Sequence, residues 1–159
     1  MDKSAVELLE KLSLRVIEYL GDEVGLDISD KFTIKSVNKT KSLYVSAVIS
    51  ISKDLCGVIG ISVPKSLIAP MTESLIFSKI SESEIDEYAE DTVSEVLNII
   101  LANVVQNLTV IKNGGEIKIT TPTITTDKTY FQKGDGCNCK LYISELSLNR
   151  DKIFISYQF

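Results

Sequence analysis

The sequence has no histidine or tryptophan, and it has only three cysteines and three prolines in 159 residues. Without histidine, a Ser-His-Asp or Cys-His catalytic site cannot form. An odd, low number of cysteines does not build a disulfide framework. Cys137 and Cys139 could supply half of a soft-metal site, but nothing else in the chain completes the ligand set. We therefore expect reduced cysteines and no metal site.

The chain also has few basic residues. It carries 17 Lys and Arg against 22 Asp and Glu, for a net charge of −5. This balance argues against a nucleic-acid partner and against binding to an anionic membrane surface. No apolar run is long enough to span a bilayer, and Glu7 and Glu10 interrupt any signal-peptide pattern. We expect a cytoplasmic protein with no nucleic-acid or membrane partner, folded as a single domain over residues 1–159.

Apolar residues with helical spacing predict two long amphipathic helices, at residues 4–20 and 84–111. Ser4 and Glu7 can form a capping box for the first, and Gly21 ends it. A shorter helical segment is expected at residues 65–76. Pro70 should disrupt that segment and leave two short pieces.

Strand patterns alternate with short polar connections through much of the remaining chain. The predicted strands are residues 31–37, 43–51, 56–63, 116–120, 140–148 and 152–159, with an extended segment at 123–130. Connections this short favour three antiparallel hairpins, which join 31–37 to 43–51, 43–51 to 56–63, and 140–148 to 152–159. The fold class is therefore α+β, with a mostly antiparallel sheet packed with the two long helices plus the short helical segment. The strands at 43–51 and 56–63 are apolar on both sides. We expect the sheet to be covered on both faces, or one edge to pair with a second chain.

The most informative stretch lies inside the predicted helix 84–111. At 100° per residue, four side chains on successive turns fall within an arc of roughly 60°. These are Asp91, Glu95, Asn98 and Ala102. One interpretation is a solvated helix face. Against it, asparagine is a poor helix former, because its side chain competes for backbone hydrogen bonds.

The run Asp91-x-x-x-Glu95-x-x-Asn98, followed by Pro122, resembles the signature of the CheC/CheX/FliY family of chemotaxis phosphatases. The segment Gly57–Pro64 is also similar to the family's strand that ends in proline and leads into a helix. A single Glu-x-x-Asn resembles the CheX branch more than the two-site CheC branch. One position departs from the pattern. The family usually has glycine one turn after the asparagine, where this chain has Ala102, which is still small.

The resemblance implies a CheC-like fold, a homodimer with joined sheets, and hydrolysis of the aspartyl phosphate of a CheY-type response regulator. Asn98 would orient the attacking water and Glu95 would dock on the partner's lysine. Asp91, Ala102 and Pro122 would serve partner binding. The protein would need no cofactor of its own, since Mg²⁺ is expected in the partner. A non-catalytic module that binds a response regulator or the flagellar switch, and a structural dimer with a merely solvated stripe, are the alternatives.

Overall fold

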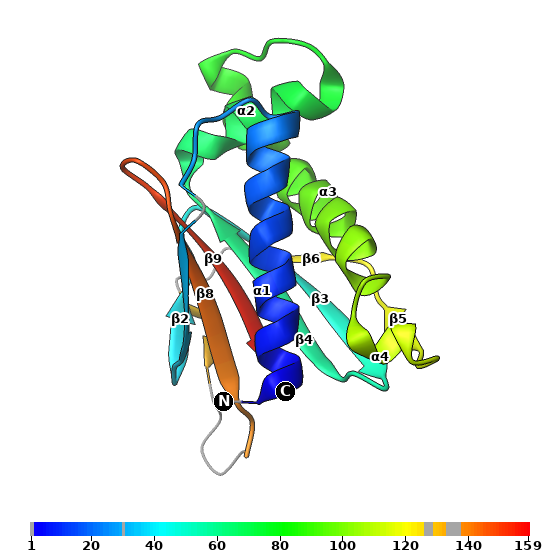
Figure 1. Cartoon of the computed structure of the whole chain (residues 1–159). Coiled ribbons are helices and arrows are strands. Elements are labelled where there is room, and N and C mark those ends of the chain that lie inside the picture. Colours follow the sequence, from blue (N-terminus) through cyan, green and yellow to red (C-terminus); the bar gives the residue numbers. More distant parts are fainter. Residues whose placement is uncertain (1, 30, 126–128, 133–137) are drawn as a thin grey trace.

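The computed structural model describes residues 2–29, 31–125, 129–132 and 138–159, and it confirms the α+β class (Figure 1). A seven-stranded sheet has the order β1-β8-β9-β4-β3-β5, and β6 pairs with β3 next to β5. Every strand pair in this sheet is antiparallel. Its strands are β1 Phe32–Ser36, β3 Val45–Lys53, β4 Gly57–Val63, β5 Ile117–Ile119, β6 Thr123–Thr125, β8 Leu141–Ser147 and β9 Lys152–Gln158.

Two long helices, α1 (Lys3–Glu18) and α3 (Ile85–Val105), lie side by side on one face of this sheet (Figure 1). A π-helical turn, Tyr19–Glu23, extends α1 past Gly21, so the prediction that Gly21 ends this helix is wrong. The side chain of Asp2, rather than that of Ser4, caps α1 by accepting hydrogen bonds from two backbone N–H groups. Both predicted amphipathic helices are therefore confirmed, but the N-cap of the first is Asp2, two residues before the predicted Ser4.

The main core lies between these helices and the sheet. Leu8, Leu9, Leu12 and Val16 of α1 are at most 2% exposed. The strands contribute side chains that are equally buried, which are Ala47, Ile49, Ile59, Ile61, Val63, Ile153, Ile155 and Tyr157. Full burial of one large aliphatic side chain is worth about 1.5–3 kcal/mol. Burial of the apolar sides of α1 and α3 against the sheet therefore determines which sides of these helices face outward.

The prediction that Pro70 splits the third helical segment is wrong. α2 (Lys65–Ile76) is continuous, with Pro70 inside it. Proline removes the hydrogen bond to the carbonyl four residues earlier, which belongs to Ser66. Ser66 is exposed, so water can satisfy that carbonyl.

The predicted helix 84–111 is too long at its C-terminal end. α3 stops at Val105, and a separate short helix, α4, spans Thr109–Lys112. Leu108 between them is only 2% exposed, so the chain turns to bury it. The side chain of Glu7 in α1 then accepts hydrogen bonds from the backbone N–H and hydroxyl of Thr109. A residue from a distant helix thus caps α4.

The predicted hairpin between the first two strands is also wrong. β1 pairs with β8, at the opposite side of the sheet from β3. Four strand spacings separate them, about 19 Å. The connection 37–44 can extend over about 26 Å and so can cross the sheet. Part of it forms β2 (Lys39–Lys41), which pairs with β7 (Thr129–Gln132) in a separate two-stranded ribbon. The other two predicted hairpins, β3–β4 and β8–β9, are confirmed.

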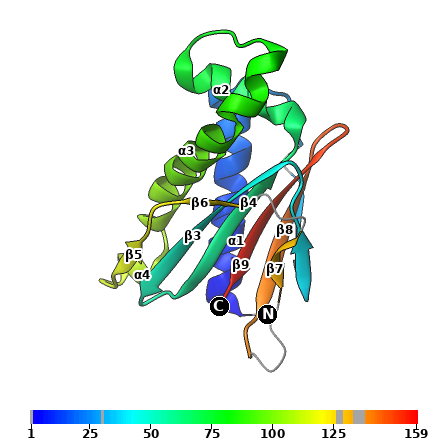
Figure 2. The same ribbon diagram turned by 180° about the vertical axis from the view of Figure 1, so that it is seen from behind.

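The sheet face away from the helices is partly covered. Figure 2 shows β7 in front of β8 on this face. Leu141 and Ile143 of β8 and Phe131 of β7 are at most 7% exposed, although they lie outside the helix-side core. The β2–β7 ribbon therefore supplies part of the second cover that the apolar strands predicted. No helix in the described part of the chain is both long and apolar enough to cross a membrane.

Candidate functional site

The helix that carries the predicted site is held firmly at its N-terminal half. Ser81 and Glu84 form a capping box just before it. The hydroxyl of Thr92 lies 2.6 Å from that of Thr72 in α2, and both residues are buried. Asp86 accepts hydrogen bonds from Lys65 Nζ at 2.7 Å and from the Tyr44 hydroxyl. α2 and the start of β3 thus fix the orientation of α3.

The structure places the predicted stripe on the outer side of α3. Asp91, Glu95 and Ala102 are exposed and Asn98 is half-buried. The opposite side of the helix is at most 1% exposed at Val93, Val96, Leu97, Ile100 and Leu101. The stripe therefore consists of side chains that a partner can reach, on a helix whose back is locked into the core.

Asn98 differs from the other two asparagines near the end of α3. The amide of Asn103 donates to the backbone carbonyl of Ile99 at 2.7 Å, and that of Asn107 donates to the carbonyl of Asn103 at 3.1 Å. Within the described residues, the Asn98 carboxamide has no such partner. Its oxygen and its NH₂ group are therefore both available to a molecule from outside.

The two carboxylates of the stripe are likewise uncommitted. Neither Asp91 nor Glu95 forms an ion pair with any residue the structure describes. Glu95 lies close enough to Tyr19, at the end of α1, to influence its ionisation. Burial raises the pKa of Tyr19, the carboxylates of Glu23 and Glu95 raise it further, and Ser74 and Arg15 oppose them.

Pro122 comes from a different part of the fold. It is half-buried in the connection between β5 and β6. β6 contacts α3 directly, so this connection reaches the site helix from the sheet side. The structure therefore places Pro122 in the segment leading into a strand that packs on α3, while the other four predicted residues share one helix.

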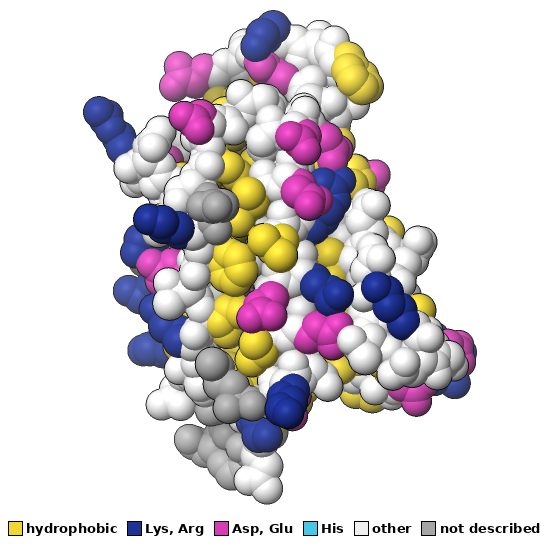
Figure 3. All heavy atoms as spheres, viewed as in Figure 1, with side chains coloured by type: hydrophobic (Ala, Val, Ile, Leu, Met, Phe, Trp, Pro, Cys, Tyr) yellow, Lys and Arg dark blue, Asp and Glu magenta, His cyan; other side chains and the backbone are white. Residues whose placement is uncertain are grey.

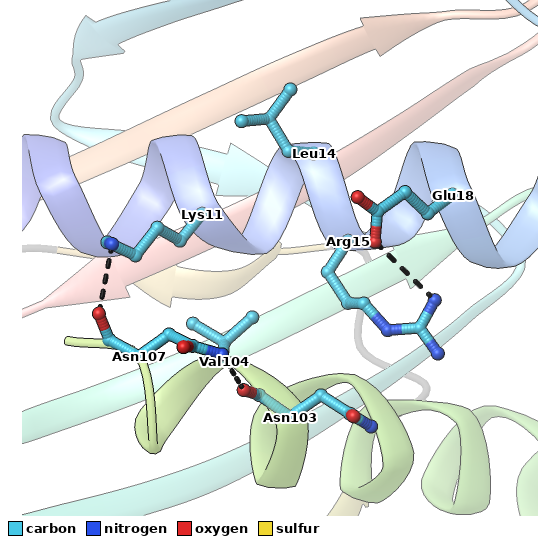
Figure 4. Close-up of a pocket in the computed structure, with 7 residues that line it drawn as sticks. All are labelled: Lys11, Leu14, Arg15, Glu18, Asn103, Val104 and Asn107. Carbon is cyan, nitrogen blue, oxygen red and sulfur yellow. Dashed lines mark hydrogen bonds and ion pairs between the residues drawn. The ribbon is translucent and has the colours of Figure 1, made fainter.

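A groove of about 420 Å³ between α1 and α3 borders the site and was not predicted (Figure 4). Lys11 Nζ reaches across it to the backbone carbonyl of Asn107 at 3.0 Å, and Arg15 pairs with Glu18 at 3.9 Å. Leu14 points away from α3. No sequence motif marks this groove, because its walls lie about ninety positions apart in the chain.

Charge is unevenly distributed over the two helices. On the face shown in Figure 3, acidic side chains gather over the upper ends of α1 and α3, whereas acidic and basic ones alternate lower down. The acidic end contains the C-terminal end of α1, where Arg15 also pairs with Glu23. A partner that carries positive charge would therefore be complementary to this end.

The cysteines do not contribute to this site. Cys56 is an exposed free thiol. Cys139 is disulfide-bonded, which corrects the expectation that it is reduced, and Cys137 lies outside the described residues. In the part of the chain that the structure describes, no three His, Cys, Asp or Glu side chains are grouped to hold a metal ion.

Comparisons with known proteins agree with this architecture. The family model described as chemotaxis phosphatase CheX matches residues 45–142, which is more than half of the chain. No curated protein matches significantly. A CheC-like superfamily protein from Shewanella sp. PV-4 superposes with a TM-score of 0.71 at 22% identity, covering 99% of this chain and 98% of the other.

Two further structures share the fold. The chemotaxis protein CheX from Desulfovibrio desulfuricans has a TM-score of 0.71 at 17% identity, with 95% and 97% of the two chains covered. The CheX–CheY–BeF₃–Mg²⁺ complex from Borrelia burgdorferi matches with a TM-score of 0.64 at 18% identity, with 96% of each chain covered. These likenesses confirm the predicted CheC-like fold.

Proposed function

We propose a function from one established premise, which is that this chain belongs to the chemotaxis phosphatase CheX family. The function is to accelerate hydrolysis of the aspartyl phosphate of a CheY-type response regulator. The observation that carries the proposal is the Asn98 carboxamide, which faces outward from a rigid helix and makes no hydrogen bond to any described residue. The Borrelia burgdorferi CheX, of the same fold, forms a complex with CheY, BeF₃ and Mg²⁺, which supports the choice of partner.

In the proposed reaction, a water molecule attacks phosphorus in line with the aspartate oxygen that leaves. The new P–O bond forms as the bond to the carboxylate breaks, releasing inorganic phosphate and a free aspartate. The Asn98 side chain would enter the partner's active site and hold the water, with its oxygen accepting a hydrogen bond and its NH₂ group available to donate. Asn98 takes no proton and forms no covalent bond. Its contribution is the orientation of the nucleophile.

The neighbouring residues would position the partner. Glu95, one turn before Asn98, would pair with the response regulator's active-site lysine and set the depth of insertion. Asp91 would add recognition at the rim, and Pro122 would shape the adjoining segment. Ala102, one turn after Asn98, has a small side chain that would let the partner come close to the helix. These roles fit the acidic end of the molecule, where a cationic side chain of the partner would find compensation.

Magnesium in this scheme belongs to the partner. The ion would neutralise phosphoryl charge in the response regulator, and this chain would need no metal of its own. We also propose a cytoplasmic homodimer that joins two sheets. β1 forms one end of the strand order, and a terminal strand has backbone groups with which a second copy can pair. Sedimentation velocity would test the dimer, and a monomer at all accessible concentrations would contradict it.

The decisive experiment measures phosphate release from a phosphorylated CheY-type response regulator. Asn98→Ala should lower the rate at saturating partner by about 100-fold or more, in the range reported for lost positioning and hydrogen-bonding groups. Asn103→Ala is the matched control, because it removes the same amide from the same helix at a residue bonded to its own backbone. Equal rates for wild type and Asn98→Ala would overturn the mechanism.

The second candidate is a non-catalytic module that binds a response regulator or a flagellar-switch component. The observation that favours it is Ala102, where the resemblance predicts glycine, because even one methyl group could hold the partner too far away for Asn98 to reach the phosphate. Binding of the phosphorylated partner without faster phosphate release would favour this module. In that case Ala102→Gly should restore turnover if the methyl group is the cause.

A further inference from the structure

Phe77 is the most conspicuous apolar side chain on the described surface. It is 93% exposed, far more than any other large hydrophobic residue the structure describes. Ile76 beside it is 44% exposed. Together they form an apolar projection at the C-terminal end of α2. A phenyl ring that stays exposed to water adds no hydrophobic stabilisation to the fold.

The backbone at this position is also unfavourable for phenylalanine. Phe77 caps α2 in the left-handed conformation, with φ 54° and ψ 33°. Glycine or asparagine normally occupies such a position, because a β-carbon there crowds the following carbonyl. An exposed aromatic residue on a strained backbone points to a use outside the folding of the chain.

The projection lies on the same corner of the molecule as the candidate site. The hydroxyl of Thr72 in α2 lies 2.6 Å from that of Thr92, which precedes Glu95 by about one turn of α3, and the hydroxyl of Tyr19 lies 3.2 Å from that of Ser74. Ser74 and Phe77 line one hollow of about 390 Å³. The rest of this hollow is formed by Glu23, Val24, Pro70, Glu73, Ser78 and Lys79.

The stripe on α3 lacks what the projection provides. Asp91, Glu95 and Asn98 offer charge and hydrogen bonds, but protein interfaces gain most of their affinity from a few buried anchors, often aromatic. A typical interface buries about 800 Å² on each partner, which corresponds to a disc roughly 30 Å across. A partner of this size seated over Glu95 and Asn98 would therefore also reach the C-terminal end of α2, where Phe77 lies.

We propose that Phe77, with the hollow beside it, is the hydrophobic anchor by which this chain binds the phosphorylated receiver domain of its response regulator. This inference rests on the proposed function and adds a specificity-determining surface to it. The receiver would bring an apolar side chain or groove to Phe77. Glu95 and Asn98 would then engage its active site. Because α2 is tied to α3 through Thr72 and Thr92, the anchor and the stripe keep a fixed separation.

The test measures phosphate release and, independently, binding of beryllofluoride-loaded CheY-type receivers from the source organism. Phe77→Ala should raise the receiver concentration for half-maximal rate by about 10-fold or more, as for a binding hot spot. The rate at saturation should stay within about two-fold of wild type. Phe77→Tyr should behave like wild type. Ile119→Ala, an exposed apolar residue on β5 at the other end of the molecule, is the control (Figure 1).

A second variant separates docking from a structural role. Phe77→Gly relieves the left-handed backbone and should raise the melting temperature by roughly 2–4 °C while weakening receiver binding as much as Phe77→Ala does. If Phe77 instead supported the fold, both properties would fall together, and the inference would be wrong.

The remaining outcomes are also decisive. If wild type is active and Phe77→Ala matches it in rate and binding, the anchor is refuted while the proposed function stands. A variant that loses self-association but still binds the receiver would assign Phe77 to contacts between copies, which also refutes the anchor. If wild type binds the receiver without turnover and Phe77→Ala weakens binding, the anchor role of Phe77 is supported and the proposed phosphatase activity is refuted. If wild type binds no receiver, both proposals fall.

Discussion

α1 and α3 are similar helices that use their polar side chains in opposite ways. Both are amphipathic, and both lie on the same face of the sheet (Figure 1). The buried hydroxyl of Ser13 in α1 donates to the carbonyl of Leu9 and lies 2.6 Å from the hydroxyl of Ser144. Glu7, Lys11 and Arg15 all bond to groups of this protein.

In the stripe on α3, by contrast, the polar side chains have no partners among the described residues. Asp91, Glu95 and Asn98 form neither an ion pair nor a side-chain hydrogen bond there. The difference teaches that polar spacing on a helix does not distinguish a structural face from a binding face. What distinguishes them is whether the protein itself already satisfies the polar groups.

The largest expected effect on stability concerns the buried apolar side that both helices have. Leu12→Ala in α1 and Leu97→Ala in α3 should each lower the free energy of unfolding by about 2–5 kcal/mol. Both leucines are 1% exposed, so each truncation leaves a cavity in the same core. Chemical denaturation monitored by circular dichroism would measure the change. If either substitution lowered the free energy of unfolding by less than about 1 kcal/mol, the buried sides of the two helices would not contribute equally to the core.

The next effect should separate the two helices. Ser13→Ala should cost about 1–3 kcal/mol of stability and leave phosphate release unchanged, because the buried Ser144 hydroxyl loses its acceptor. Ser144→Ala should cost less, since Ser13 keeps its bond to Leu9.

Asn98→Ala provides the opposite half of this comparison. It should change stability by less than about 0.5 kcal/mol, as for a surface substitution, while lowering the rate of phosphate release by about 100-fold or more. Thermal unfolding and phosphate release, measured on the same preparations, would check all three variants. A strong loss of stability in Asn98→Ala would mean that this amide serves the fold.

A smaller effect should mark the docking role of the stripe. Glu95→Ala should raise the partner concentration for half-maximal rate by about 10-fold, or about 1.4 kcal/mol, by removing one charge-assisted contact. Glu90→Ala, an exposed acid on the same helix, controls for net charge. Steady-state kinetics at varied partner concentration would distinguish the two variants. If both variants raised the partner concentration for half-maximal rate equally, Glu95 would act only through long-range electrostatic attraction.

The smallest effect lies on α1. Burial raises the pKa of Glu7, but hydrogen bonds from Thr109 and Lys11 outweigh it, so the pKa is lowered overall. Its stabilisation should be complete above the ordinary glutamate pKa and should disappear as pH falls through the lowered value. Glu7→Gln should therefore cost about 0.5–1 kcal/mol at pH 7, after allowance for solvent screening, and less in acid. Denaturant titrations from pH 7 to pH 3 would measure this, and a difference that grows in acid would contradict the sign.

Local patterns predicted what depends on near neighbours. The period of apolar residues located both long helices, and the wheel placed Asp91, Glu95, Asn98 and Ala102 on one outward face. Local patterns failed where distant groups intervened. The 84–111 pattern continues past Val105 because Leu108 is apolar, yet Leu108 is buried by a turn and α4 is capped by Glu7 from another helix.

Strand order shows the same limit. Short polar connections predicted three hairpins, of which β3–β4 and β8–β9 are correct. The remaining connection carries β2 and crosses to the other side of the sheet, because β8 supplies the pairing partner of β1. Pairing Phe32 with Leu146 joins residues more than a hundred positions apart, and no local pattern encodes such a choice.

The sequence by itself determined the fold class, the amphipathic sides of α1 and α3, and the order of Asp91, Glu95 and Asn98 along one face. These follow from the 3.6-residue helical period and from the exclusion of apolar side chains from water. Only the tertiary structure decided the strand order, the anchoring of α3 through Thr72 and Thr92, and which of the three asparagines is free of the backbone. These depend on contacts between segments that only the folded chain brings together, where burial and hydrogen bonding outweigh local preference.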